Sequence, residues 1–70
     1  MGFRSVEKHP HSVVLWARRP FPGRFGSYVA VRLRYGRLSV GVRHPGFVEW
    51  VPAERALSEQ EAERWARSGF

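Results

Sequence analysis

Arginine is the residue type in this chain with the greatest capacity to bind a charged ligand. The chain has 70 residues and a formal net charge of +6, and it contains 11 arginines but one lysine. A guanidinium group binds phosphate or carboxylate through paired hydrogen bonds and also stacks on planar rings. Residues 1–47 hold nine basic side chains and one acidic one, so this part is expected to bind an anionic partner.

A β-hairpin over residues 27–44 is the clearest structural prediction. Apolar and polar residues alternate over 27–35 and again over 37–44, which is the period of a strand with one buried face. Gly36 and Arg37 suit a two-residue turn between these strands. The face expected to be open carries Tyr28, Ala30, Arg32, Arg34, Ser39, Gly41 and Arg43, and Arg37 lies in the turn.

This open face is predicted to be the binding surface. In the predicted register, Arg34 lies opposite Ser39 and Arg32 lies opposite Gly41, so small residues leave the guanidinium groups free. Planar cations together with the ring of Tyr28 are typical of a platform for nucleic acid. The alternatives are contact with an acidic protein and a solvated strand face without a ligand.

Residues 18–26 are predicted to form a loop, because two prolines and two glycines interrupt any regular pattern. Arg18, Arg19 and Arg24 make this segment a basic arm beside the hairpin, which favours the same anionic partner. Its two phenylalanines either belong to this arm or fill the end of the core.

The segment 12–18 is predicted to be an earlier strand with apolar residues on both faces. Val14 and Trp16 share one face, and Val13 and Leu15 share the other. A single helix covers one side of a sheet, so the second side needs a loop, a second copy or a partner protein. Trp16 and Val14 are therefore predicted to lie at a protein interface, either in a homodimer or with another protein.

The C-terminal part is predicted to add one helix. Ser58 and Glu61 have the spacing of a capping box, which predicts a helix over 58–68. In the alternative with four strands, residues 47–51 form the fourth strand, and their pattern does not show which side chains face the core. Pro52 suits a turn or a helix start. The expected fold is a single α+β domain over residues 1–70, in which a small antiparallel meander of three to four strands packs one face against the helix.

Several classes of site are disfavoured by the residue types present. The absence of cysteine excludes disulfides and cysteine-based zinc sites, and the three histidines lack the spacing of metal ligands. No nucleophile with a positioned base can be named, so we predict no catalytic residues, no metal and no cofactor, although a ribonuclease built on histidine and arginine is an alternative. The chain has no long apolar run and no apolar leader, so a cytoplasmic protein without a membrane segment is expected.

Three interpretations of function, from different classes, follow from these patterns. The leading expectation is a small non-enzymatic module that uses its arginine face on nucleic acid or a ribonucleoprotein. The alternative is an accessory or inhibitor protein of the kind encoded by phages and mobile elements. It would dock on an acidic surface or nucleic-acid channel of a larger machine, such as a polymerase, nuclease or defence complex. A third interpretation is a toxin or nuclease subunit that an acidic partner neutralises.

Overall fold

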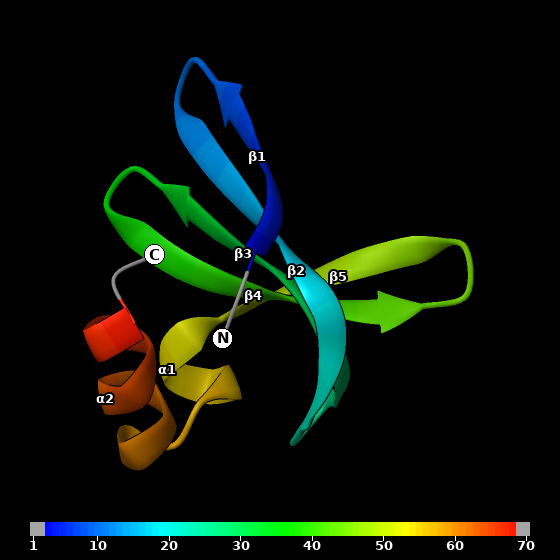
Figure 1. Ribbon diagram of the computed structural model, residues 1–70, viewed down its shortest axis with the longest axis vertical. Helices are drawn as coiled ribbons and strands as arrows, with labels where there is room; N and C mark the ends of the chain where they lie inside the picture. The colour runs from blue at the N-terminus through cyan, green and yellow to red at the C-terminus, as the bar shows by residue number, and fades with distance from the viewer. Residues whose placement is uncertain (1–2, 69–70) are drawn as a thin grey trace.

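The protein folds as a five-stranded antiparallel sheet followed by two short helices (Figure 1). The computed structural model describes residues 3–68, with side chains for residues 3–64. The elements in chain order are β1 (Phe3–His9), β2 (Ser12–Gly23), β3 (Gly26–Arg34), β4 (Arg37–His44), β5 (Phe47–Pro52), α1 (Ala53–Ala56) and α2 (Glu59–Ser68). The predicted α+β class is confirmed, but the strands number five rather than three to four, and the helical part is divided in two.

The N-terminal half contains more strand than the sequence predicted. β1 was not predicted, because its apolar residues Phe3 and Val6 do not alternate regularly with polar ones. The prediction of a loop over 18–26 is also wrong, since β2 continues to Gly23 and pairs with β3. Between two of these pairings, four residues of β2 face a single residue of β3. Pro20 lies in this irregular stretch, where a missing N–H costs the sheet little.

The hairpin of β3 and β4 is present, with its turn one residue earlier than predicted. Tyr35 and Gly36 have φ angles of 50° and 73°, and two positive values are the signature of a type I′ turn. Arg34 consequently lies opposite Arg37, and Leu33 lies opposite Leu38. The partners therefore differ from the predicted ones by two positions, an even shift that keeps these side chains on their predicted faces.

Tyr28 belongs to the core and not to the arginine face. The pairing of β3 with β4 skips Val29, which is the extra residue of a β-bulge. The bulge reverses the alternation, so Tyr28 lies on the same face as Val31 and is fully buried. Its hydroxyl donates a hydrogen bond of 2.6 Å to the carbonyl of Ala56. The predicted position of Tyr28 among the arginines is wrong for this reason.

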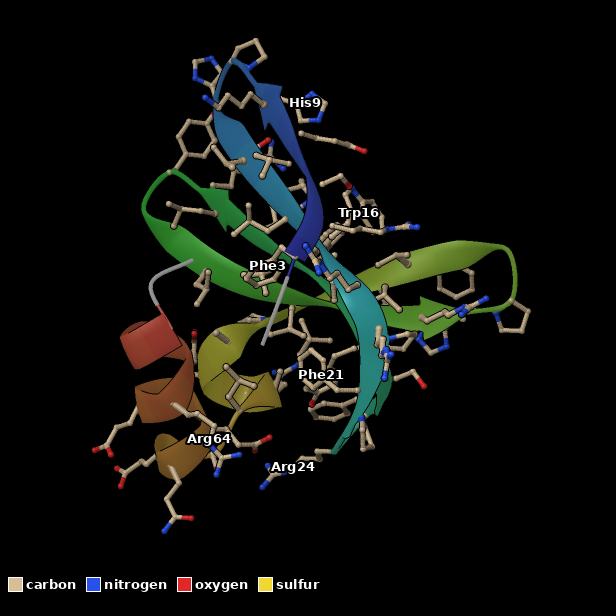
Figure 2. The ribbon with its side chains drawn as sticks, viewed as in Figure 1. Phe3, His9, Trp16, Phe21, Arg24 and Arg64 are labelled. Atoms are coloured by element: carbon tan, nitrogen blue, oxygen red, sulfur yellow. The ribbon has the colours of Figure 1, made fainter. Side chains whose placement is uncertain are left out.

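The hydrophobic core lies between the sheet and α1. Figure 2 shows Phe3 and Phe21 on the side of the sheet that faces the helices, and Trp16 on the other side. Phe21 packs edge-to-face on Tyr28, with 5.4 Å between the ring centroids, so at least one phenylalanine of the predicted loop fills the core. The buried members of the core are Tyr28, Val31, Val40, Val42, Val51, Ala56 and Leu57.

Both helices begin where local chemistry predicts. Pro52 precedes α1, and its fixed φ angle suits the start of a helix. The capping box at α2 is confirmed, because the Ser58 amide donates to the Glu61 carboxylate at 3.1 Å and the Glu61 amide donates to the Ser58 hydroxyl at 3.2 Å. Leu57, between the two helices, is buried against the sheet.

The hydrogen bond from Tyr28 is expected to contribute measurably to stability. Tyr28→Phe should lower the free energy of unfolding by about 1–2 kcal/mol, because it leaves the buried Ala56 carbonyl without this donor. For a domain of this size the melting temperature should fall by about 5–10 °C. Tyr35→Phe is the control, since Tyr35 is 69% exposed and should tolerate the change. Equal melting temperatures for the two variants would contradict the assignment of Tyr28.

Candidate nucleic-acid interface

A row of two tryptophans and two small residues crosses the sheet on the side opposite the core. Trp16 lies beside Ala30, Ala30 beside Gly41, and Gly41 beside Trp50, so the row extends over β2, β3, β4 and β5. Both indoles are half-buried. A methyl group on Gly41 would lie 2.9 Å from Cγ1 of Val48 and 3.1 Å from Cζ3 of Trp50, so a side chain at this position would press on both neighbours.

Arg32 is held against Trp50 on this face. The carbon of its guanidinium group lies 4.6 Å from the centroid of the indole, which is a cation–π contact. Burial lowers the pKa of Arg32, and the neighbouring charge of Arg34 lowers it further. Among the described residues, Nε of Arg32 is enclosed and has no hydrogen-bond acceptor. The fold therefore holds a partly desolvated cation beside an aromatic ring.

A groove opens beside this pair, which we call the Trp50 groove. It has a volume of about 530 Å³. It combines a planar aromatic ring, two guanidinium groups, a hydroxyl and one carboxylate, that of Glu54. Its lining residues are Arg32, Gly36, Arg37, Leu38, Ser39, Trp50, Pro52 and Glu54.

A second groove, the Trp16 groove, lies further along the same side of the sheet. It has a volume of about 330 Å³ and brings together three arginines with no acidic residue in its lining. Nε1 of Trp16 donates a hydrogen bond of 2.9 Å to the carboxylate of Glu7 on β1, which fixes the orientation of the indole. The lining residues are Arg4, Trp16, Ala17, Arg18, Pro20, Val29, Arg43 and Val48.

The positive charge of this side is not neutralised within the described side chains. The carboxylates of Glu7 and Glu49 contact the imidazoles of His9 and His44. Arg34 and Arg37 lie directly opposite each other, an arrangement of like charges that destabilises a sheet. Within residues 3–64, no carboxylate pairs with the arginines of this side, which are Arg4, Arg18, Arg32, Arg34, Arg37 and Arg43.

Five of the predicted site residues come together here. Arg32 and Arg37 line the Trp50 groove, whereas Arg18, Arg43 and Trp16 line the Trp16 groove. These five come from three separate strands, β2, β3 and β4, so the sheet and not a loop positions them.

Other predicted site residues lie elsewhere. Arg34 is beside the Trp50 groove, with its guanidinium 5.5 Å from the ring of Tyr35. Arg19 is exposed outside both grooves, and Arg24 lies at the far end of the β2–β3 hairpin, away from Trp16 (Figure 2). Val14 is 6% exposed within the sheet, so it offers little surface to a partner, contrary to the prediction.

Trp50 and Arg4 were not predicted as site residues. Trp50 belongs to a strand that reads as apolar on both faces, which hid its facing. Gly41 was the available signal, because a glycine inside a strand often marks a close approach by another group. Arg4 gave no signal, since β1 itself was not predicted.

The described residues show neither a metal cluster nor a membrane-spanning helix. Among residues 3–64, no three histidine, cysteine, aspartate or glutamate side chains gather closely enough to hold a metal ion. No helix in the described part of the chain combines the length and hydropathy that crossing a bilayer requires.

Comparison with known protein families, with curated proteins and with solved structures finds no match. The interpretation of this face therefore depends on its own geometry and charge.

Proposed function

We propose that this protein is a non-enzymatic module that binds nucleic acid with the side of the sheet that carries the Trp16 and Trp50 grooves. The observation that carries this proposal is the set of six arginines without carboxylate partners around two half-buried indoles. Guanidinium groups bind phosphate oxygens, and aromatic rings stack on bases. Both kinds of contact are supplied by one surface.

The distribution of acidic residues supports the same direction of approach. The glutamates of the helices are Glu54, Glu59, Glu61 and Glu63, and three of them lie on α2 outside both grooves. α2 also carries Arg64 and Arg67, which leaves it a formal net charge of −1, so a polyanion is attracted more strongly to the sheet than to α2. A net charge of +6 on 70 residues also favours fast association at low salt.

The test is a salt titration of binding to labelled DNA and RNA, followed by fluorescence anisotropy. Five arginines of the site are exposed, namely Arg4, Arg18, Arg34, Arg37 and Arg43. If each neutralises one phosphate, a plot of the logarithm of the binding constant against the logarithm of the salt concentration should have a slope of about −3.5 for single strands and about −4.5 for duplex. Arg43→Ala should flatten the slope by about one, and Arg24→Ala should leave it unchanged. An absence of binding to either nucleic acid at low salt would contradict the proposal.

A second function is favoured by an apolar patch on the core side of the sheet. A hollow of about 160 Å³ is lined by Val13, Leu15, Val31, Leu33 and Leu38. Leu33 is 48% exposed, and Val6 on β1, the strand beside β2, is 53% exposed. Such a patch suits an accessory protein that docks on a larger nucleic-acid-handling complex. This function takes precedence if the purified protein binds no naked DNA or RNA.

A further inference from the structure

We infer that the ligand is single-stranded, with an unpaired base in the Trp50 groove and the phosphate backbone along the Trp16 groove. This inference rests on the proposed function and specifies which form of nucleic acid the site takes. It depends on the different chemistry of the two grooves, on their recessed shape and on the distance between the two indoles.

The Trp50 groove has the chemistry of a base site. The indole of Trp50 and the guanidinium of Arg32 form a stack 4.6 Å apart, to which a flat base can add. Glu54 would repel a phosphate at this position, but its carboxylate accepts hydrogen bonds from the N–H groups of a base. The phosphate of the same nucleotide is then expected at Arg37, on the rim of the groove.

The Trp16 groove has the chemistry of a backbone site. Arg4, Arg18 and Arg43 converge on it from three strands, and no carboxylate lines it. The one acidic group near Trp16, that of Glu7, already accepts the indole N–H. The guanidinium groups are therefore available for phosphate oxygens, which they bind through paired hydrogen bonds.

The shape of the site disfavours a duplex. Proteins that read B-DNA insert a protruding helix or ribbon into a groove about 12 Å wide, and there they meet base edges and not base faces. Here the indoles are half-buried and line open grooves on the face of the sheet, so a ligand that stacks on them must present the face of a base. Only an unpaired base can turn its face into such a groove.

The distance between the grooves sets the length of the ligand. Trp16 and Trp50 lie three strand spacings apart, which is about 14 Å. Stacked neighbours along one strand are about 3.4 Å apart, so one mononucleotide cannot fill both grooves. Affinity should rise steeply up to about three or four nucleotides and more gradually beyond that length.

The experiment compares a single-stranded 12-mer with a duplex of the same sequence, at the same salt concentration. Electrostatics alone predicts tighter binding of the duplex, because its charge density is higher. We expect the opposite, with the single strand bound at least about tenfold more tightly, since stacking is available only to unpaired bases. Trp50→Leu should remove most of this preference, while Phe47→Leu, at the first residue of β5 and 61% exposed, should leave it intact.

A fluorescence measurement keeps the test valid if Trp50→Leu does not fold. The chain has three tryptophans, and replacing Trp16 and Trp65 by phenylalanine leaves Trp50 as the single indole. Its emission should be quenched by the single strand and not by the duplex. Equal or tighter binding of the duplex, or unchanged emission of Trp50 on binding, would overturn this inference and leave the proposed function standing. Binding of neither form would overturn both.

Discussion

Val31→Asp is expected to unfold the protein, whereas Leu33→Asp should leave it folded. Val31 is 2% exposed and is paired between Leu15 and Val40 in the sheet. An unpartnered buried carboxylate costs several kcal/mol, about as much as the whole stability expected of a 70-residue domain. Leu33 shares the face of Val31, but it is 48% exposed, so its aspartate can remain in contact with water.

Circular dichroism on heating measures this difference. The Val31→Asp protein should show no cooperative transition, and the Leu33→Asp protein should melt within about 5–10 °C of the parent, in keeping with a cost near 1 kcal/mol. Two folded variants would mean that Val31 is not enclosed. Two unfolded variants would mean that the patch around Leu33 is covered and belongs to the core.

Reversing two charges on the binding side should have the largest effect on affinity. The double variant Arg37→Glu, Arg43→Glu places a carboxylate in each groove and should weaken binding to a single strand by about 100-fold at low salt. Arg24→Glu, Arg55→Glu is the matched control, because it changes the net charge equally at positions that line neither groove. This control should lose about threefold, through long-range repulsion alone.

Titrations of the two double variants at matched salt decide between a localised site and a diffuse field. A large loss of affinity in the Arg37→Glu, Arg43→Glu variant alone places the phosphates on this side of the sheet. An equal loss in the control variant would mean that affinity follows net charge, and the grooves would then have no special part in binding. Melting curves of both proteins establish that the fold is unchanged, which is expected because Arg37 and Arg43 are exposed.

The hairpin at the centre of the site was predictable from two local signals, the alternation of apolar and polar residues in both strands and the glycine between them, Gly36. The alternation places Arg32, Arg34 and Arg43 on one face, and the structure has them on that face. The exact turn was not predictable, because it requires a positive φ at Tyr35, a conformation that aromatic residues rarely adopt. The error in the turn did not change the predicted faces. Moving the turn by one residue shifts the pairing of the strands by two residues, and side chains alternate with a period of two.

The bulge at Val29 was the consequential omission. Its neighbours form an uninterrupted alternating strand, and the one glycine of β3 is Gly26 at its first position, so neither a glycine nor a proline marks the extra residue at Val29. Strict alternation therefore placed Tyr28 in the site, although it is the largest fully buried side chain of the core. Pro20 led to a different error, because it predicted a loop where β2 continues. The pairing of β2 with β3 is irregular at this position, so the proline does not end the strand.

The site as a whole was predictable in composition but not in architecture. The arginine excess pointed to an anionic ligand, but the two grooves depend on contacts between distant residues. Trp50 pairs with Gly41, nine residues earlier, and Trp16 donates a hydrogen bond to Glu7 on a strand that was not predicted. Which of two faces a strand presents is decided by what packs against it, and that information is not local.

The order of strands in this sheet also bears on how the chain folds. Every strand pairs with its neighbour in sequence, so short hairpins account for the whole sheet and no long loop must close before pairing begins. Such low contact order places the protein among the faster folders of the β-rich domains. The hydrogen bond from Tyr28 to Ala56 spans 28 residues, a longer sequence separation than in any strand pairing of the sheet. During synthesis the strands that carry the arginines leave the ribosome first, and α1 then closes the core behind them.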